Sequence, residues 1–144
     1  MIEKERKFLF EGGIALKNPM TIQQGYLMLD GDKHLRVRVI DGKSAYLTFK
    51  IIHEPTFRSE YEYEIPLNDG VEMLESTKTK LQKIRYKTEF EGNSVDIDFY
   101  PDGLKIVEIE FENELINIPS YCGREISGEK EYSNIYIALK NQNL

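Results

Sequence analysis

The feature that most constrains this chain is an alternation of apolar and charged residues with a period of two. Successive side chains of a β-strand point to opposite faces, so each alternating run predicts a strand with one apolar and one charged face. The pattern occurs at residues 3–10, 23–29, 35–40, 45–51, 60–65, 83–87, 94–100 and 106–111. Between the third and fourth runs, Asp41 and Gly42 form a turn signal typical of antiparallel hairpins. The sequence therefore predicts a mainly antiparallel β protein.

Helical periodicity is confined to two segments. Asp69, with Glu72 three residues later, resembles an acidic capping box and predicts a helix that begins there. The apolar residues expected on one face of that helix are Val71, Leu74 and Leu81. Near the C-terminus, a second amphipathic helix is expected to follow Ser133, because apolar residues have i, i+3, i+4, i+7 spacing at Tyr132, Ile135, Tyr136 and Leu139. A short helical turn is also expected around residues 113–116.

Length and composition limit the class of protein. The 144 residues suit one domain, expected over residues 1–144, and a hydrophobic content of 40% is enough for a core. No apolar run could span a bilayer and the charged first residues do not resemble a signal peptide, so a cytoplasmic protein without membrane contact is expected. The net charge of −6, from 19 basic and 25 acidic residues, argues against nucleic acid as a partner.

Soft metal ligands are scarce in this chain. A single cysteine, Cys122, cannot form an internal disulfide, which fits a reducing compartment. Together with only two histidines, His34 and His53, it is too little for a zinc site built from His and Cys. None of these three residues has a partner at a useful spacing, so none is assigned a role. Any metal ion would be a hard cation held by carboxylate oxygens.

Pairs of like charge recur at positions i and i+2 on six of the predicted strands. The pairs are Glu3/Glu5, Arg36/Arg38, Glu60/Glu62, Lys83/Arg85, Asp96/Asp98 and Glu108/Glu110. On any single strand the charges could belong to a face in water, but repeated like charges are unfavourable unless something binds between them. Carboxylate pairs suit Mg²⁺ or Mn²⁺, and Arg and Lys pairs suit an anion with several oxygens. A closed barrel of about eight strands would enclose both sets and form a tunnel for a metal-complexed polyphosphate.

Taken in order, these runs resemble the CYTH superfamily, the triphosphate tunnel metalloenzymes. The opening Glu3-Lys4-Glu5-Arg6-Lys7 is similar to the ExExK motif of that family. Further similar segments are Gln24-Gly25-Tyr26-Leu27, Leu35-Arg36-Val37-Arg38, Leu47-Thr48-Phe49-Lys50, Arg58-Ser59-Glu60-Tyr61-Glu62, Lys83-Ile84-Arg85-Tyr86 and Val107-Glu108-Ile109-Glu110-Phe111. One motif alone would be weak, but the ordered series extends over most of the chain. At this length the chain most resembles the short bacterial members.

The resemblance implies a closed eight-stranded antiparallel β-barrel with a few flanking helices, including one at the C-terminus. It implies that a linear triphosphate binds in the tunnel with Mg²⁺ or Mn²⁺. The catalytic and metal-binding residues it implies are Glu3, Glu5, Glu108 and Glu110, with Asp98 as a further metal ligand. The residues it implies for gripping the phosphates are Lys7, Arg36, Arg38, Lys50, Lys83, Arg85 and Lys130. Glu60 and Glu62 are expected to support them by orienting the basic side chains.

The expected activity is metal-dependent hydrolysis of inorganic triphosphate to pyrophosphate and phosphate. Three alternatives remain open: a nucleoside or thiamine triphosphatase, a class IV type adenylyl cyclase, and a non-catalytic module that binds triphosphate or polyphosphate. No segment identifies the base pocket that a cyclase needs, and simple anion binding would not require so many carboxylates. Glu131 departs from the family pattern, because a second basic residue is expected there beside Lys130.

Overall fold

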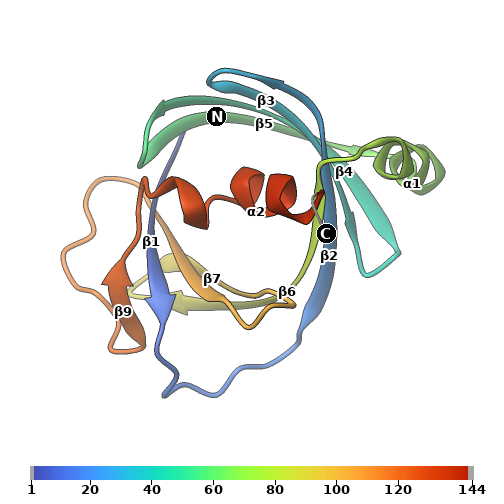
Figure 1. Cartoon of the computed structure of the whole chain (residues 1–144). Coiled ribbons are helices and arrows are strands. Elements are labelled where there is room, and N and C mark those ends of the chain that lie inside the picture. The colour runs from blue at the N-terminus through green and yellow to red at the C-terminus, as the bar shows by residue number, and fades with distance from the viewer. Residues whose placement is uncertain (1, 143–144) are drawn as a thin grey trace.

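Backbone pairing joins eight antiparallel strands into a ring in the computed structural model, which describes residues 2–142 (Figure 1). The strands are β1 (Ile2–Phe10), β2 (Met20–Asp30), β3 (Lys33–Ile40), β4 (Ser44–Glu54), β5 (Phe57–Ile65), β6 (Lys80–Phe90), β7 (Asn93–Phe99) and β8 (Lys105–Phe111). Their order is β5-β4-β3-β2-β6-β7-β8-β1, and β1 pairs with β5 to close the ring. The expected eight-stranded antiparallel barrel is confirmed.

A short ninth strand, β9 (Cys122–Glu125), was not predicted. Strand β1 pairs with β5 through Ile2–Lys4, and its other end pairs with β9 through Phe8 and Phe10. The four residues of β9 show no alternation of their own. They form a strand because an unpaired edge of β1 lies beside them. This contact joins segments that are more than 100 residues apart, so the local sequence pattern does not predict it.

The hairpin between β3 and β4 forms as the sequence predicts. Asp41 and Gly42 adopt positive φ angles of 53° and 63°, and the Lys43 N–H donates to the Ile40 carbonyl at 2.9 Å. Such turns favour glycine and aspartate because most other residues are strained at positive φ.

Charged residues line the interior of the ring. Residues that face each other across an antiparallel pair point to the same side, and the register pairs Glu5 with Glu110, Lys7 with Glu108 and Arg85 with Asp98. Charged side chains buried within the fold include Glu5, Arg36, Arg38, Lys83, Arg85, Asp96 and Asp98. The predicted inward-facing charges are therefore confirmed for these residues.

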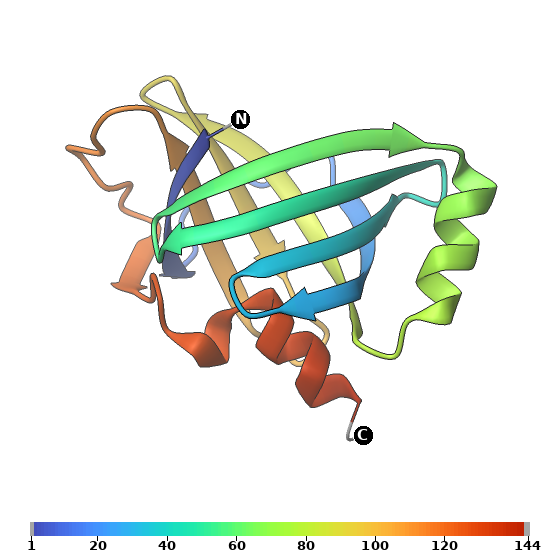
Figure 2. The same cartoon turned by 90° about the horizontal axis from the view of Figure 1, so that it is seen from above.

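Two α-helices flank the ring, α1 (Leu67–Ser76) and α2 (Asn134–Asn141). Figures 1 and 2 together show α2 across one end of the ring and α1 outside it. The predicted C-terminal helix is confirmed, with Ser133 as its N-cap: the Tyr136 N–H donates to the Ser133 hydroxyl at 3.1 Å. No helix in residues 2–142 has the length and apolar character needed to cross a membrane.

Three details of the helix predictions were wrong. Helix α1 begins after Pro66, so Asp69 lies in its first turn instead of capping it. The helix ends at Ser76, so Leu81 is not part of it. Leu81 belongs to β6, and the pairing of β6 with β2 determines its extended conformation. Residues 113–116 form an irregular loop.

The apolar core is divided between the outside and one end of the ring. The outer cluster packs β1, β7 and β8 against the loop after β8, through Phe8, Val95, Ile97, Val107, Ile109, Leu115 and Tyr121. The second cluster lies where α2 meets the ring and consists of Leu81, Tyr100, Ile106, Ile126 and Ala138. Helix α2 is therefore fixed to that end by apolar contacts.

Gly70 allows α1 to approach β4 closely. A Cβ atom at this position would overlap the methyl group of Ala45. We expect Gly70→Ala to lower the free energy of unfolding by about 1–3 kcal/mol, because overpacking outweighs the better helix propensity of alanine. Urea unfolding measures the change. Glu72→Ala, at an exposed position of the same helix, is the control and should stay within about 0.5 kcal/mol. Equal stability of G70A and the unaltered protein would contradict the close packing.

Candidate functional site

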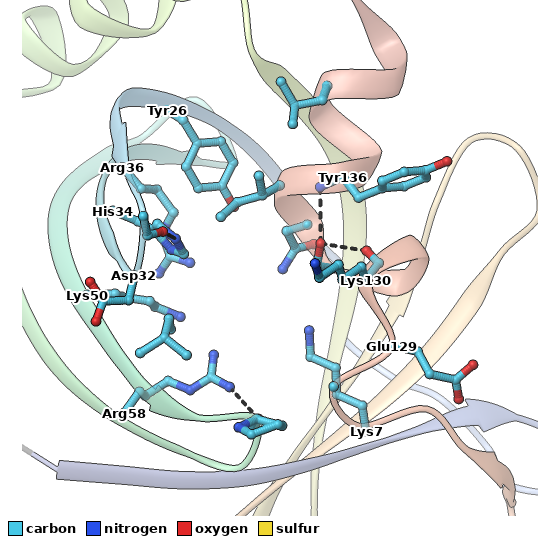
Figure 3. Close-up of a pocket in the computed structure, with 18 of the residues that line it drawn as sticks. Lys7, Tyr26, Asp32, His34, Arg36, Lys50, Arg58, Glu129, Lys130 and Tyr136 are labelled. Atoms are coloured by element: carbon cyan, nitrogen blue, oxygen red, sulfur yellow. Dashed lines mark hydrogen bonds between the residues drawn. The ribbon is translucent and has the colours of Figure 1, made fainter.

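A cavity of about 600 Å³ opens at the α2 end of the ring. The side chains of Lys7, Arg36, Lys50, Arg58 and Lys130 converge on it from four strands and from the turn before α2 (Figure 3). Alternation brings the four strand residues to the inner face, and the 3₁₀ turn Lys130–Tyr132 adds the last. Five cationic groups around one cavity form a site for a multiply charged anion.

Three carboxylates gather on the neighbouring strands β1 and β8. Glu3, Glu5 and Glu110 each offer an oxygen, and these oxygens lie within 4.8 Å of one another. Glu3 and Glu5 are two residues apart on β1, and Glu110 on the neighbouring strand β8 lies directly opposite Glu5. The structure thus brings together three of the four glutamates predicted to bind metal. An all-oxygen donor set suits a hard divalent cation.

These carboxylates are crowded and poorly solvated. Burial and the nearby charge of Glu108 raise the pKa of Glu5 to about 7, even though an Arg58 nitrogen lies 3.0 Å from Glu5 Oε1. Burial likewise raises the pKa of Glu3 and Glu110, and neighbouring carboxylates add to both effects. Glu5 Oε1 is buried and accepts no hydrogen bond of good geometry from residues 2–142. The positive charge of Arg58 therefore only partly offsets the three carboxylates.

Glu108, the fourth predicted metal ligand, lies beside this cluster. On β8 it lies opposite Lys7 of β1 and opposite Asp96 of β7. Arg85 Nη2 is 3.9 Å from Glu108 Oε2. Although burial disfavours its ionised form, Lys7 and Arg85 hold the pKa of Glu108 well below its usual range. Glu108 thus lies between the acidic and basic parts of the interior.

Three of the predicted phosphate-binding residues are buried and do not line this cavity. Arg38 donates two hydrogen bonds to Gln24 Oε1, at 2.9 and 3.1 Å. Arg85 donates to both carboxylate oxygens of Asp98, at 2.7 and 2.9 Å. Lys83 is fully buried, and its Nζ lies 2.8 Å from Asp98. Among the described residues that line the cavity, Arg38, Lys83 and Arg85 do not occur.

Asp98 is engaged by cations on both oxygens. Burial opposes its ionisation, but Lys83 and Arg85 hold the pKa of Asp98 far below its usual range. Its carboxylate lies outside the cluster of Glu3, Glu5 and Glu110. Its predicted role as a metal ligand stays a prediction, and in this structure it anchors two buried cations.

Strand β5 supplies the residues expected to orient the basic side chains. Glu60 lies 3.6 Å from Arg36 and 3.8 Å from Lys50. Burial opposes ionisation of Glu60, but contact with Glu3 and the charges of Lys50 and Arg36 lower its pKa to about 2. Glu62 accepts a hydrogen bond from the Thr48 hydroxyl at 2.9 Å and lies 3.8 Å from Arg36.

Arg58 was missed as a site residue in the sequence. It lines the cavity and forms the ion pair with Glu5 that joins the basic and acidic regions. The signal was present, because Arg58 precedes Glu60 by two residues and so belongs to the same inward face of β5. Glu131, in contrast, is exposed and does not line the cavity, whereas its neighbour Lys130 does.

A second cavity, of about 1150 Å³, has a different charge. The acidic residues that line it are Glu3, Glu91, Glu110, Glu112 and Glu114, and Lys4 contributes the opposite charge. Glu3 and Glu110 belong both to this lining and to the carboxylate cluster. The second cavity is therefore lined mainly by carboxylates, whereas the first is lined by five Lys and Arg side chains together with Asp32 and Glu129.

Known proteins share this arrangement of strands and much of the sequence. The chain matches the CYTH domain family over residues 1–142. It is 40% identical to an inorganic triphosphatase from Acetivibrio thermocellus, over 92% of this chain and 90% of that protein. A solved structure of an inorganic triphosphatase is 27% identical, with a TM-score of 0.67 over 95% of this chain and 94% of that one. A conserved protein from Pyrococcus furiosus, 21% identical with a TM-score of 0.64 over 99% of this chain and 91% of its own, shares the fold.

The crowding of carboxylates leads to a prediction for the metal-free protein. The pKa of Glu5 is raised in the folded state, so its charge costs stability above about pH 7 and costs little at pH 5, where the carboxyl is protonated. We expect Glu5→Gln to increase the free energy of unfolding by about 1–3 kcal/mol at pH 8 in the presence of a chelator, with a smaller gain at pH 5. Thermal and urea unfolding test this, with Glu75→Gln on the exposed side of α1 as control. A loss of stability at pH 8 would show that the ion pair with Arg58 outweighs the cost of burying the Glu5 charge, and would contradict this prediction.

Proposed function

The chain belongs to the CYTH domain family, and from this premise we propose that it hydrolyses inorganic triphosphate to pyrophosphate and phosphate with Mg²⁺ or Mn²⁺. The observation that carries the proposal is that two oppositely charged sites lie close together. One is a cavity with five cationic side chains, and the other is a cluster of three carboxylates. A polyphosphate complexed with a divalent cation has both charges in one ligand. The inorganic substrate is chosen because the relative that is 40% identical is an inorganic triphosphatase.

The residues present fit a divalent cation. Glu3, Glu5 and Glu110 offer oxygens within 4.8 Å of one another, and the buried Oε1 of Glu5 has an ion-pair contact with Arg58 but no hydrogen bond from the described residues. We assign these three residues as the ligands, with Glu108 completing the set. When bound, such an ion neutralises charge on the phosphoryl group and acts as a Lewis acid. Nitrogen and sulfur ligands play no part in this assignment, in agreement with a preference for Mg²⁺ or Mn²⁺.

The chain's own residues bind and align the triphosphate. Lys7, Arg36, Lys50, Arg58 and Lys130 neutralise its oxygens from several sides, which fixes the polyanion in the cavity. Most of the catalysis of phosphoryl transfer comes from such positioning and from charge stabilisation in the transition state. A water molecule attacks the terminal phosphorus, the bond from that phosphorus to the bridging oxygen breaks, and pyrophosphate leaves. A carboxylate of the interior accepts the proton of the water.

Ion pairs with carboxylates hold the basic side chains in place. Asp98 fixes Arg85 and Lys83, and Glu60 fixes Arg36 and Lys50. We assign Arg38, Lys83 and Arg85 to the positive field around the phosphates, with Asp98, Glu60 and Glu62 as positioning residues.

The activity is tested by incubating the protein with tripolyphosphate, ATP or thiamine triphosphate, each with Mg²⁺, Mn²⁺ or a chelator. We expect phosphate and pyrophosphate from tripolyphosphate only when a metal ion is present. Faster turnover of ATP or thiamine triphosphate would instead select an organic triphosphatase. Cyclic AMP with pyrophosphate would select a cyclase, and binding without turnover would select a non-catalytic module.

Glu110→Gln tests the metal assignment. The substitution keeps the size of the side chain but removes one charge from the cluster, so we expect metal-dependent phosphate release to fall by about 100-fold or more. Circular dichroism and thermal unfolding should show an intact fold. The matched control is Glu75→Gln on α1, which should keep full activity. A fully active Glu110→Gln protein would remove Glu110 from the site.

A further inference from the structure

Asn134 connects α2 to the interior of the ring. It is the first residue of the helix, directly after the N-cap Ser133. Its Oδ1 accepts a hydrogen bond of 2.6 Å from the Tyr100 hydroxyl and one of 3.3 Å from Lys83 Nζ. Asn134 is half-buried and also lines the cavity that contains Lys7 and Lys130. One side chain thus contacts both the buried cation and the open cavity.

The orientation of the Asn134 amide is fixed by its partners. The Lys83 ammonium, paired with Asp98 at 2.8 Å, has only hydrogens to offer, so the oxygen of the amide must face it. The exchanged orientation would place an NH₂ group against an ammonium. Nδ2 is therefore turned away from Lys83 and Tyr100, and it donates to no acceptor among residues 2–142.

Asn134 contacts Lys83 and lines the cavity, whereas Lys83 is not among the described lining residues. Lys83 has no exposed surface, and its ammonium contacts Asp98, Asn134 and the face of the Tyr100 ring, whose centroid is 5.7 Å away. A neutral donor with a free N–H on a wall of cations is a group suited to a phosphate oxygen.

We propose that Asn134 is a substrate-binding residue, whose Nδ2 donates to a non-bridging oxygen of the triphosphate at the end nearest α2. Oδ1 meanwhile holds Lys83 and Tyr100 in place. This inference rests on the proposed function, because it takes the triphosphate as the occupant of the cavity. The proposal adds to the site a neutral residue of α2, which the alternation of charged residues along the strands does not include.

Two substitutions separate donation from the other roles of this side chain. Asn134→Asp keeps an acceptor for Lys83 and Tyr100 but removes the donor and adds a negative charge. Asn134→Ala removes donor and acceptor without adding charge. The loss of the N–H donor is the change that both variants share. We therefore expect both to weaken tripolyphosphate binding by about tenfold or more, since a hydrogen bond to a charged group has that magnitude.

Binding of tripolyphosphate is measured by calorimetry in the presence of a chelator, and KM and kcat are measured with Mg²⁺. We expect the KM to rise about tenfold in both variants while kcat changes less, and the effect of Asn134→Asp to persist at high salt, where charge repulsion is screened. Asn141→Asp introduces the same charge at the other end of α2, outside the cavity lining, and should alter KM by less than about twofold. Thermal unfolding checks the fold of each variant.

The outcomes distinguish the explanations. Weakening by Asn134→Ala alone would show a purely structural role, and weakening by Asn134→Asp alone, lost at high salt, would show charge repulsion. Either result, or no effect of either variant, would overturn the proposal. Unaltered protein that binds tripolyphosphate without hydrolysing it would contradict the proposed function and still allow the binding test. Unaltered protein that binds no tripolyphosphate under either condition would contradict both.

Discussion

The structure depends on pairing charges inside a ring of strands. A buried ion without a partner costs several kcal/mol, and the interior of this ring contains many ions. Between strands β6 and β7 the buried charges are paired directly. Arg85 and Lys83 on β6 lie 2.7–2.8 Å from Asp98 on β7. That part of the wall is satisfied by its own partners. It can serve as a rigid support because it requires no ligand to neutralise it.

Other parts of the interior are not balanced in this way. Glu3, Glu5 and Glu110 gather at one place with Arg58 as the nearest cation on Glu5, and Lys7 and Lys130 face open space at another. The net charge of −6 conceals this separation. The positions of the excess charges, and not their sum, determine what can bind. A complex of a divalent cation with a polyanion would neutralise both regions at once.

The alternation of the sequence was sufficient for the strands and their inward residues. A shift of one residue would turn every charge on a strand to the opposite face, so the pattern fixes which side faces inward. Local patterns did not predict β9, which exists because β1 lies beside it, or the start of α1 after Pro66. They predicted Lys83 on the inner face, where it is buried beside Asp98, and its role toward a phosphate stays a prediction. The sequence pattern within each strand determines that strand and its inward face. The features that the pattern did not predict arise from contacts between segments that are distant in the sequence.

Asn134 illustrates the limit of sequence reasoning most directly. Nothing in a helical spacing of apolar residues distinguishes this asparagine, and its partner Lys83 is 51 residues away. Its contacts exist because an apolar cluster around Ala138 and Ile126 fixes α2 at the end of the ring. The buried apolar residues of that cluster lower the dielectric constant beside the amide, and hydrogen bonds and charge interactions are stronger where the dielectric constant is low. Apolar packing of the helix therefore determines both where the amide lies and how strongly it can bind an anion.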